Sequence, residues 1–137
     1  MTTSGKLSSG DPERLADLGV RHVINLALED HPEALENEAG RFAALHIGYS
    51  HIPVPFDAPA MEHFEAFRMA LAEAEGPVHV HCIMNWRVSA FFYLKDIAEG
   101  VPQAEAYARM AEIWDPFTSD HPLAAPWKAL LENAKCS

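Results

Sequence analysis

The sequence has few cysteines, few basic residues and no long hydrophobic run. It holds two cysteines, Cys82 and Cys136, and because Cys136 is next to last we expect no structural disulfide and a reducing, cytoplasmic location. Lys and Arg number 10 against 20 Asp and Glu, which gives a formal net charge of −10. This balance argues against nucleic acid or an anionic membrane surface as a partner. The first ten residues contain no apolar run, so we expect no signal peptide, and no segment reaches the length of a membrane span.

The length and composition indicate one globular domain over residues 1–137. A chain of this size buries roughly two-thirds of its unfolded surface and needs no disulfide or metal to hold it together. A short apolar, β-branched run predicts a strand over 21–28. Residues 48–56 are expected to be extended, confined to an edge or to their end by Pro53 and Pro55, and 78–82 to form a short strand. Helical periodicity and end signals predict helices over 11–20, 33–45, 59–77, 88–100, 102–116 and 122–135.

The alternation of strands with helices predicts an α/β fold, in which a parallel sheet is covered by helices on both faces. Ligands of such folds bind at the carboxyl ends of the strands. Three segments are expected at that edge: "ALED" at 27–30, "PFDAP" at 55–59 and "CIMNWR" at 82–87. We therefore expect a functional crevice where these segments meet. At the other end of the chain, Asp11 is expected as the N-cap of the first helix, with Pro12 at its first position.

The segment from Cys82 to Arg87 has the composition of an anion-binding loop. Cys82 is expected to end a strand and Val88 to begin a helix, so the loop lies at a helix N-terminus, where free N–H groups and the helix dipole favour anions. A thiol in that position has a lowered pKa and becomes a nucleophilic thiolate, and a guanidinium binds two oxygens of an oxyanion. The alternative is a small buried Cys in a core and a solvated Arg.

The stretch "HCIMNWRVS" resembles the signature His-Cys-x-x-Gly-x-x-Arg-Ser/Thr of protein tyrosine and dual-specificity phosphatases. The segment "SSGDPERLADLGVRHVINL" is similar to the opening of the bacterial dual-specificity-like group. The resemblance covers about residues 4–115. It implies a protein tyrosine phosphatase-like fold, with a short parallel sheet flanked by helices on both faces, and a Cys-dependent phosphatase that hydrolyses phosphate monoesters without a cofactor or metal.

The resemblance also implies roles for single residues. Cys82 takes the phosphoryl group, His81 supports the loop and the thiolate, and Ser89 assists the thiolate as a leaving group. Asn85 falls on the Gly position of the signature, and Asn is the non-Gly residue best suited to positive φ. The oxyanion-binding loop would consist of Ile83, Met84, Asn85, Trp86 and Arg87.

Arg87 departs from the signature, because it follows Cys82 by five residues and the family has its Arg at six, where Val88 stands. In one alignment the loop keeps the phosphatase length and Arg87 reaches in from one position earlier. In the other the loop is one residue shorter and resembles the Cys-x4-Arg loop of rhodanese-type sulfurtransferases, which implies a persulfide on Cys82. A third reading is a catalytically weak module that binds oxyanions or phosphoproteins on the same fold.

A phosphatase of this type needs a general acid for the leaving group. Asp57 lies 25 residues before Cys82 in "VPFDAPAMEHF", and the resemblance implies that it is this acid; an ordinary turn or N-cap Asp is the alternative. Asp30 is the second candidate. We expect the substrate to be a phosphorylated small molecule or a phosphoprotein, and we expect Trp86 to face it. His79 and His81 share one strand face but have no third ligand at useful spacing, so no metal site is expected.

Overall fold

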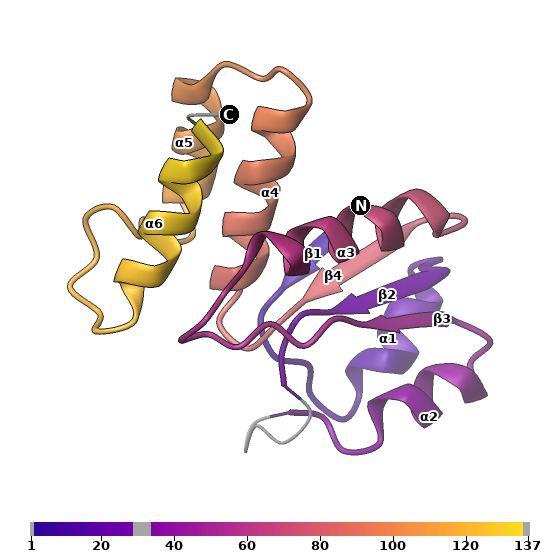
Figure 1. Ribbon diagram of the computed structural model, residues 1–137. Coiled ribbons are helices and arrows are strands. Elements are labelled where there is room, and N and C mark those ends of the chain that lie inside the picture. The colour runs from indigo at the N-terminus through magenta and orange to yellow at the C-terminus, as the bar shows by residue number, and fades with distance from the viewer. Residues whose placement is uncertain (1, 29–33, 136–137) are drawn as a thin grey trace.

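The computed structural model describes residues 2–28 and 34–135, which contain a four-stranded parallel sheet (Figure 1). Its strands are β1 (Thr2–Ser4), β2 (His22–Asn25), β3 (Gly48–His51) and β4 (Val78–His81), in the order β1-β4-β2-β3. The three predicted strands are confirmed; β3 lies at an edge of the sheet and ends before Pro53 and Pro55. The sequence reasoning missed β1, because three polar residues carry no strand pattern. This segment is a strand because it pairs with β4, with Ser4 opposite His81.

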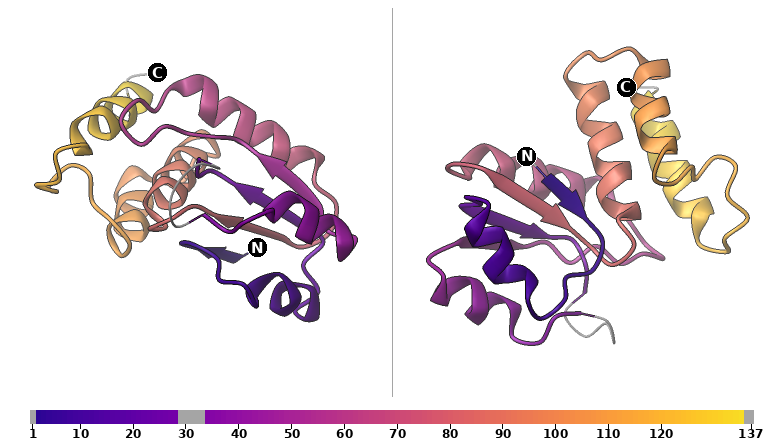
Figure 2. Two further views of the ribbon diagram at one scale, coloured as in Figure 1. Left: turned by 90° about the horizontal axis from the view of Figure 1, so that it is seen from below. Right: turned by 180° about the vertical axis from the view of Figure 1, so that it is seen from behind.

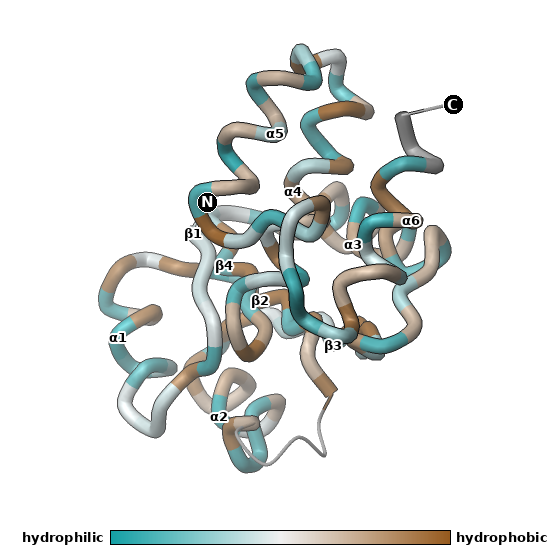
Figure 3. The backbone as a smooth tube through the Cα atoms, turned by 90° about the vertical axis from the view of Figure 1, so that its left-hand side faces the viewer, coloured by the Kyte–Doolittle hydropathy of each residue, from teal (hydrophilic) through white to brown (hydrophobic). Residues whose placement is uncertain are grey.

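Helices cover both faces of the sheet, as predicted. The helices are α1 (Asp11–Asp17), α2 (Glu38–Ala44), α3 (Met61–Glu73), α4 (Trp86–Ala98), α5 (Gln103–Ala111) and α6 (Ala124–Lys135). Helices α1 and α2 lie on one face, and α3 lies on the other, with α4, α5 and α6 grouped beside it (Figures 1 and 2). Hydrophobic and hydrophilic residues both occur within each turn of α5, as expected for a helix that packs with one side (Figure 3).

Strand β4 separates the two cores of the molecule. Val78 and Val80 belong to the larger core, which α3, α4 and α6 complete with Phe67, Phe91 and Trp127. A smaller core lies between the opposite face and helices α1 and α2. His79 and His81 alternate with the valines along β4 and are buried. The strand that leads into the loop at Cys82 is thus buried on both faces and forms a rigid base.

The N-cap of α1 and the start of α4 differ from the expectations, and α2, α3 and α6 begin two to five residues later than predicted. Helix α1 begins at Asp11 with Gly10 as its N-cap, so Asp11 is not the cap; its carboxylate instead accepts a hydrogen bond of 2.7 Å from the backbone N–H of Ser8. Helix α4 begins at Trp86 rather than at Val88, because Asn85 takes the N-cap position with a φ of 63°. Arg87 therefore lies in the first turn of a helix and not in a loop.

Candidate functional site

The loop after β4 is fixed from below by the first residues of the chain. The carbonyl of Ile83 accepts a hydrogen bond of 2.8 Å from the N–H of Lys6, and the N–H of Cys82 donates to the carbonyl of Ser4 at 3.4 Å. A Cβ on Gly5 would lie 2.5 Å from the carbonyl oxygen of Ile83, which is a forbidden contact. Only glycine allows so close an approach at that position. The sequence reasoning assigned no part in the site to residues 2–6.

Arg87 lies beside Cys82 although it comes one residue early. Burial lowers the pKa of Arg87, and the charge of Cys82 and a hydrogen bond with its side chain oppose that shift. Cys82 is 1% and Arg87 7% exposed. The guanidinium carbon also lies 5.3 Å from the centre of the Phe56 ring, a cation–π contact. The Nε of Arg87 is buried and has no hydrogen-bond partner within the described part of the chain, so an oxyanion would supply one.

Asn85 and Ser89 lie where the loop turns into α4. The φ of 63° at Asn85 is the left-handed conformation that glycine and asparagine favour, as expected for the Gly position of the signature. The hydroxyl of Ser89 donates to the carbonyl of Trp86 at 2.9 Å. Both residues line a cavity of about 240 Å³ between α4 and α5, and not the pocket that contains Cys82. The structure thus places Ser89 behind the loop.

Cys82, Arg87 and Asp57 line one pocket of about 700 Å³. Asp57 is exposed and lies in the turn that the N–H of Ala58 closes on the carbonyl of Pro55, at 3.2 Å. Asp30, the second candidate acid, is outside the described residues. The pocket is lined by Leu28, Phe56, Asp57, Cys82, Ile83, Met84, Trp86, Arg87, His121 and Leu123. Most of these side chains are apolar, and Arg87 is the one Lys or Arg side chain in that lining.

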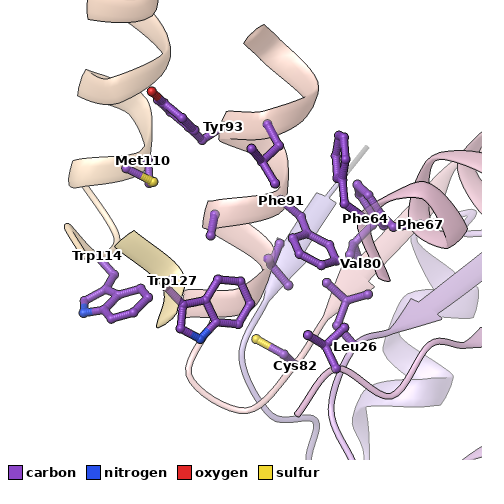
Figure 4. Packing of buried hydrophobic residues seen from close by; sticks show 14 of the residues in the cluster. Leu26, Phe64, Phe67, Val80, Cys82, Phe91, Tyr93, Met110, Trp114 and Trp127 are labelled. Carbon is purple, nitrogen blue, oxygen red and sulfur yellow. The ribbon is translucent and has the colours of Figure 1, made fainter. Parts of the chain in front are cut away.

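An aromatic cluster that the sequence reasoning did not foresee forms one wall of the pocket. The rings of Trp86 and Trp114 stack with centroids 4.8 Å apart, so Trp86 both lines the pocket and packs. Phe56 contacts Trp86, Trp114 and Trp127 at 5.6 to 5.9 Å between ring centroids. Figure 4 shows Trp114 and Trp127 side by side, with the Cys82 sulfur on the side where Trp127 lies. Their core positions were predicted, but their closeness to Cys82 depends on tertiary packing.

His121 is a pocket residue that no sequence signal identified. Its ring meets Trp86 edge-on at 85°, with centroids 5.6 Å apart. Its Nδ1 accepts a hydrogen bond of 3.0 Å from the N–H of Leu123, so in the neutral ring the proton is on Nε2. That leaves an N–H donor on a residue of the pocket lining. It lies between α5 and α6, outside any recognisable motif.

Beneath the loop, the two histidines of β4 have different partners. His81 Nε2 lies 2.8 Å from the carboxylate of Glu38, a contact that the sequence did not indicate. His79 lies between the hydroxyls of Thr2 and Ser4, at 2.6 and 2.8 Å, and burial together with the neighbouring His81 lowers its pKa to about 4. Among the described residues, no group of three His, Cys, Asp or Glu side chains is arranged to hold a metal ion. Within the same residues, no helix is long and apolar enough to cross a membrane.

Comparison with known proteins bears on the family and on the fold. The sequence model of the family described as "Beta-lactamase hydrolase-like protein, phosphatase-like domain" matches residues 1–99. A β-lactamase hydrolase-like protein from Xylella fastidiosa (strain Temecula1) is 29% identical over 103 residues, which are 73% of this chain and 24% of that protein. The chain therefore spans about a quarter of the length of the curated relatives that it matches.

Solved structures similar to this chain identify the fold. A DUF442 protein from Shewanella putrefaciens CN-32, described as a candidate phosphatase, is 29% identical with a TM-score of 0.80, over 98% of this chain and 85% of that one. A TpbA variant from P. aeruginosa, solved in complex with pTyr, has a TM-score of 0.66 at 17% identity, over 98% of this chain and 84% of that one. The expected protein tyrosine phosphatase-like fold is confirmed.

Proposed function

Because the chain belongs to the family of phosphatase-like domains of β-lactamase hydrolase-like proteins, we propose that it hydrolyses phosphate monoesters with Cys82 as the nucleophile. The observation that carries this proposal is the contact between Arg87 and Cys82 at the N-terminus of α4. A buried guanidinium with an unpartnered Nε, next to a thiol at a helix N-terminus, is the arrangement that a tetrahedral oxyanion needs.

The reaction follows in two steps. The Cys82 thiolate attacks phosphorus, an S–P bond forms, the ester P–O bond breaks, and Asp57 gives its proton to the leaving oxygen. A water molecule then attacks the phosphocysteine, Asp57 takes a proton from that water, and the thiolate leaves. Throughout, Arg87 and the backbone N–H groups of residues 83–87 bind the phosphoryl oxygens. His81 supports the loop through the contact of its ring with the carbonyl of Cys82. The Ser89 hydroxyl supports the start of α4 through its hydrogen bond to the carbonyl of Trp86.

The pocket lining favours substrates with an apolar or aromatic organic group. Phe56, Trp86 and Leu123 would contact that group, while Arg87 binds the phosphate. A phosphorylated small molecule or a phosphotyrosine side chain fits this description, and the pTyr complex of TpbA supports it. With a formal net charge of −10, nothing favours a polyanionic partner.

The test compares two Cys→Ser variants in hydrolysis of 4-nitrophenyl phosphate. Cys82→Ser removes the proposed nucleophile and should abolish turnover, whereas Cys136→Ser is the matched control and should leave it unchanged. Acid quenching of the wild type during turnover, followed by mass spectrometry, should find one phosphoryl group on the peptide that holds Cys82. Equal activity of the two variants would exclude the proposed mechanism.

Sulfur transfer is the second candidate, and the spacing of five residues between Cys82 and Arg87 favours it. A loop that enters α4 at Trp86 encloses less space than a longer one, which suits a sulfane sulfur better than a phosphate. In this reaction the Cys82 thiolate attacks the outer sulfur of thiosulfate, an S–S bond forms on Cys82 and sulfite leaves. Mass spectrometry after thiosulfate treatment decides: one added sulfur on Cys82 supports transfer, and none rejects it. Phosphate binding without either reaction would indicate a binding module.

A further inference from the structure

Glu38, the first residue of α2, is a carboxylate inside the protein. Its side chain is 6% exposed and its Oε2 lies 2.8 Å from Nε2 of His81, whose side chain is 3% exposed. An acidic side chain is rarely buried to this extent without a partner that balances its charge. Here His81 is the partner, and it directly precedes Cys82 in the chain.

The contacts of His81 determine where its protons lie. Its Nδ1 lies 3.3 Å from the backbone carbonyl of Cys82, and a carbonyl only accepts, so Nδ1 carries a hydrogen. Its Nε2 faces the Glu38 carboxylate, which as an anion also only accepts. With the Glu38 carboxylate ionised, both ring nitrogens of His81 therefore face an acceptor.

We propose that Glu38 is a positioning residue of the Cys82 site: it holds His81 as an imidazolium with one N–H toward the carbonyl of Cys82, so that a positive ring lies beneath the nucleophile. The proposal rests on the proposed function in so far as a stabilised thiolate serves a nucleophilic Cys82. The proposal goes beyond the proposed function because it assigns a role to Glu38, a residue of α2, which lies on the opposite side of the sheet from the pocket.

Other charged groups also act on Cys82, so the contribution of Glu38 has to be isolated. Arg87 of α4 contacts the thiol, and Asp57 and His121 line the same pocket. His79 stacks on His81 with ring centroids 6.3 Å apart, and the charge of Asp11 in α1 reaches His79. The charge of Glu38 also raises the pKa of His79, so Glu38→Gln acts on that ring as well as on His81.

The experiment measures the pH dependence of Cys82 alkylation by iodoacetamide, in a Cys136→Ser background and by mass spectrometry. Glu38→Gln keeps the shape but removes the charge that holds the second proton on His81. The midpoint for Cys82 should then rise by roughly one pH unit, because a thiolate loses a nearby positive charge. Glu62→Gln is the matched control, since Glu62 also lies in the first turn of a helix but is exposed. Equal midpoints in the two variants would overturn the proposal.

Two further measurements separate a specific effect from a loss of structure. In a His81→Asn background, adding Glu38→Gln should produce no additional rise; a further rise of the same size would mean that Glu38 does not act through His81. In the unsubstituted protein at pH 7, the ¹⁵N chemical shifts of His81 should report two protonated ring nitrogens, and one bare nitrogen would contradict the proposal. Neither measurement uses turnover, so failure here is distinct from failure of the proposed phosphatase.

Discussion

The indole N–H of Trp127 donates a hydrogen bond of 2.8 Å to the backbone carbonyl of Phe56. This bond joins α6 to the turn that carries Asp57, 71 residues earlier in the chain. Residues 100–135 lie outside the matched part of the family, which ends at residue 99. The last quarter of the chain therefore positions one side of a pocket whose proposed nucleophile and guanidinium come from the part that matches the family.

Trp127→Phe tests that connection. The variant keeps an aromatic ring in a fully buried position but leaves the carbonyl of Phe56 without its donor, so we expect the free energy of unfolding to fall by about 1–3 kcal/mol. Trp114→Phe is the matched control, because the buried Nε1 of Trp114 has no hydrogen-bond partner among the described residues. Urea denaturation should therefore give a clearly smaller loss for Trp114→Phe. An equal loss in both variants would mean that ring volume, rather than the bond to Phe56, determines the effect.

Gly5→Ala tests whether the first residues of the chain support the loop. Its Cβ would lie 2.5 Å from the carbonyl oxygen of Ile83, so the loop backbone or β1 must move. We expect a loss of about 1–3 kcal/mol in stability, together with lower activity toward aryl phosphates. Gly10→Ala is the control, because its Cβ would meet Arg14 at an ordinary 3.9 Å. Wild-type stability in Gly5→Ala would show that the contact is easily relieved.

How far the sequence predicted this molecule can be judged from particular residues. The strand before Cys82, the helix after it and the left-handed Asn85 all followed from local signals: a short Val-containing segment, helical periodicity and the conformational preference of Asn. Asp57 was identified by its order in the chain, and it does line the pocket with Cys82. Its catalytic role remains a prediction.

The residues that were missed depend on contacts between distant segments. Glu38 reaches His81 across 43 residues, and Trp127 reaches Phe56 across 71. Neither pairing has a local signature, since a Glu at the start of a helix is ordinarily solvated and a Trp at helical spacing ordinarily packs. Gly5 resembles any glycine near a terminus until the carbonyl of Ile83 is seen beside it. Tertiary geometry alone makes these residues part of the site.

The position of Arg87 can be tested by restoring the phosphatase spacing. The double variant R87V/V88R puts the guanidinium six residues after Cys82, but Val88 is 1% exposed and belongs to the main core. Burying an unpaired charge there should cost about 3 kcal/mol or more beyond the single variant R87V. Thermal denaturation of both variants checks this. If R87V/V88R were as stable as R87V and hydrolysed aryl phosphates, the early Arg would be incidental.

The buried His79 should make stability depend on pH. Its pKa is lowered from 6.5 to about 4 in the folded protein, so the unfolded chain takes up a proton there between these values and the folded chain does not. The free energy of unfolding should therefore fall as the pH is lowered from 6.5 to 4. His79→Asn should reduce this slope, leaving the part due to His22, whose pKa burial also lowers. Melting temperatures measured across this pH range test the prediction, and His46→Asn, at an exposed histidine, is the control. An unchanged slope in His79→Asn would contradict the assignment to His79.

The proposed acid can be distinguished from an ordinary turn residue by the leaving group. Asp57→Asn should lower kcat for phenyl phosphate by about 100-fold or more, because phenolate is a poor leaving group without a proton donor. The loss should be much smaller for 4-nitrophenyl phosphate, whose leaving group departs as a stabilised anion. Asp120→Asn changes another exposed carboxylate near the end of the chain and should affect neither substrate. Equal losses for the two esters in Asp57→Asn would instead indicate that Asp57 positions the turn. His121, which also lines the pocket and carries its neutral-ring proton on Nε2, would then become the acid to test.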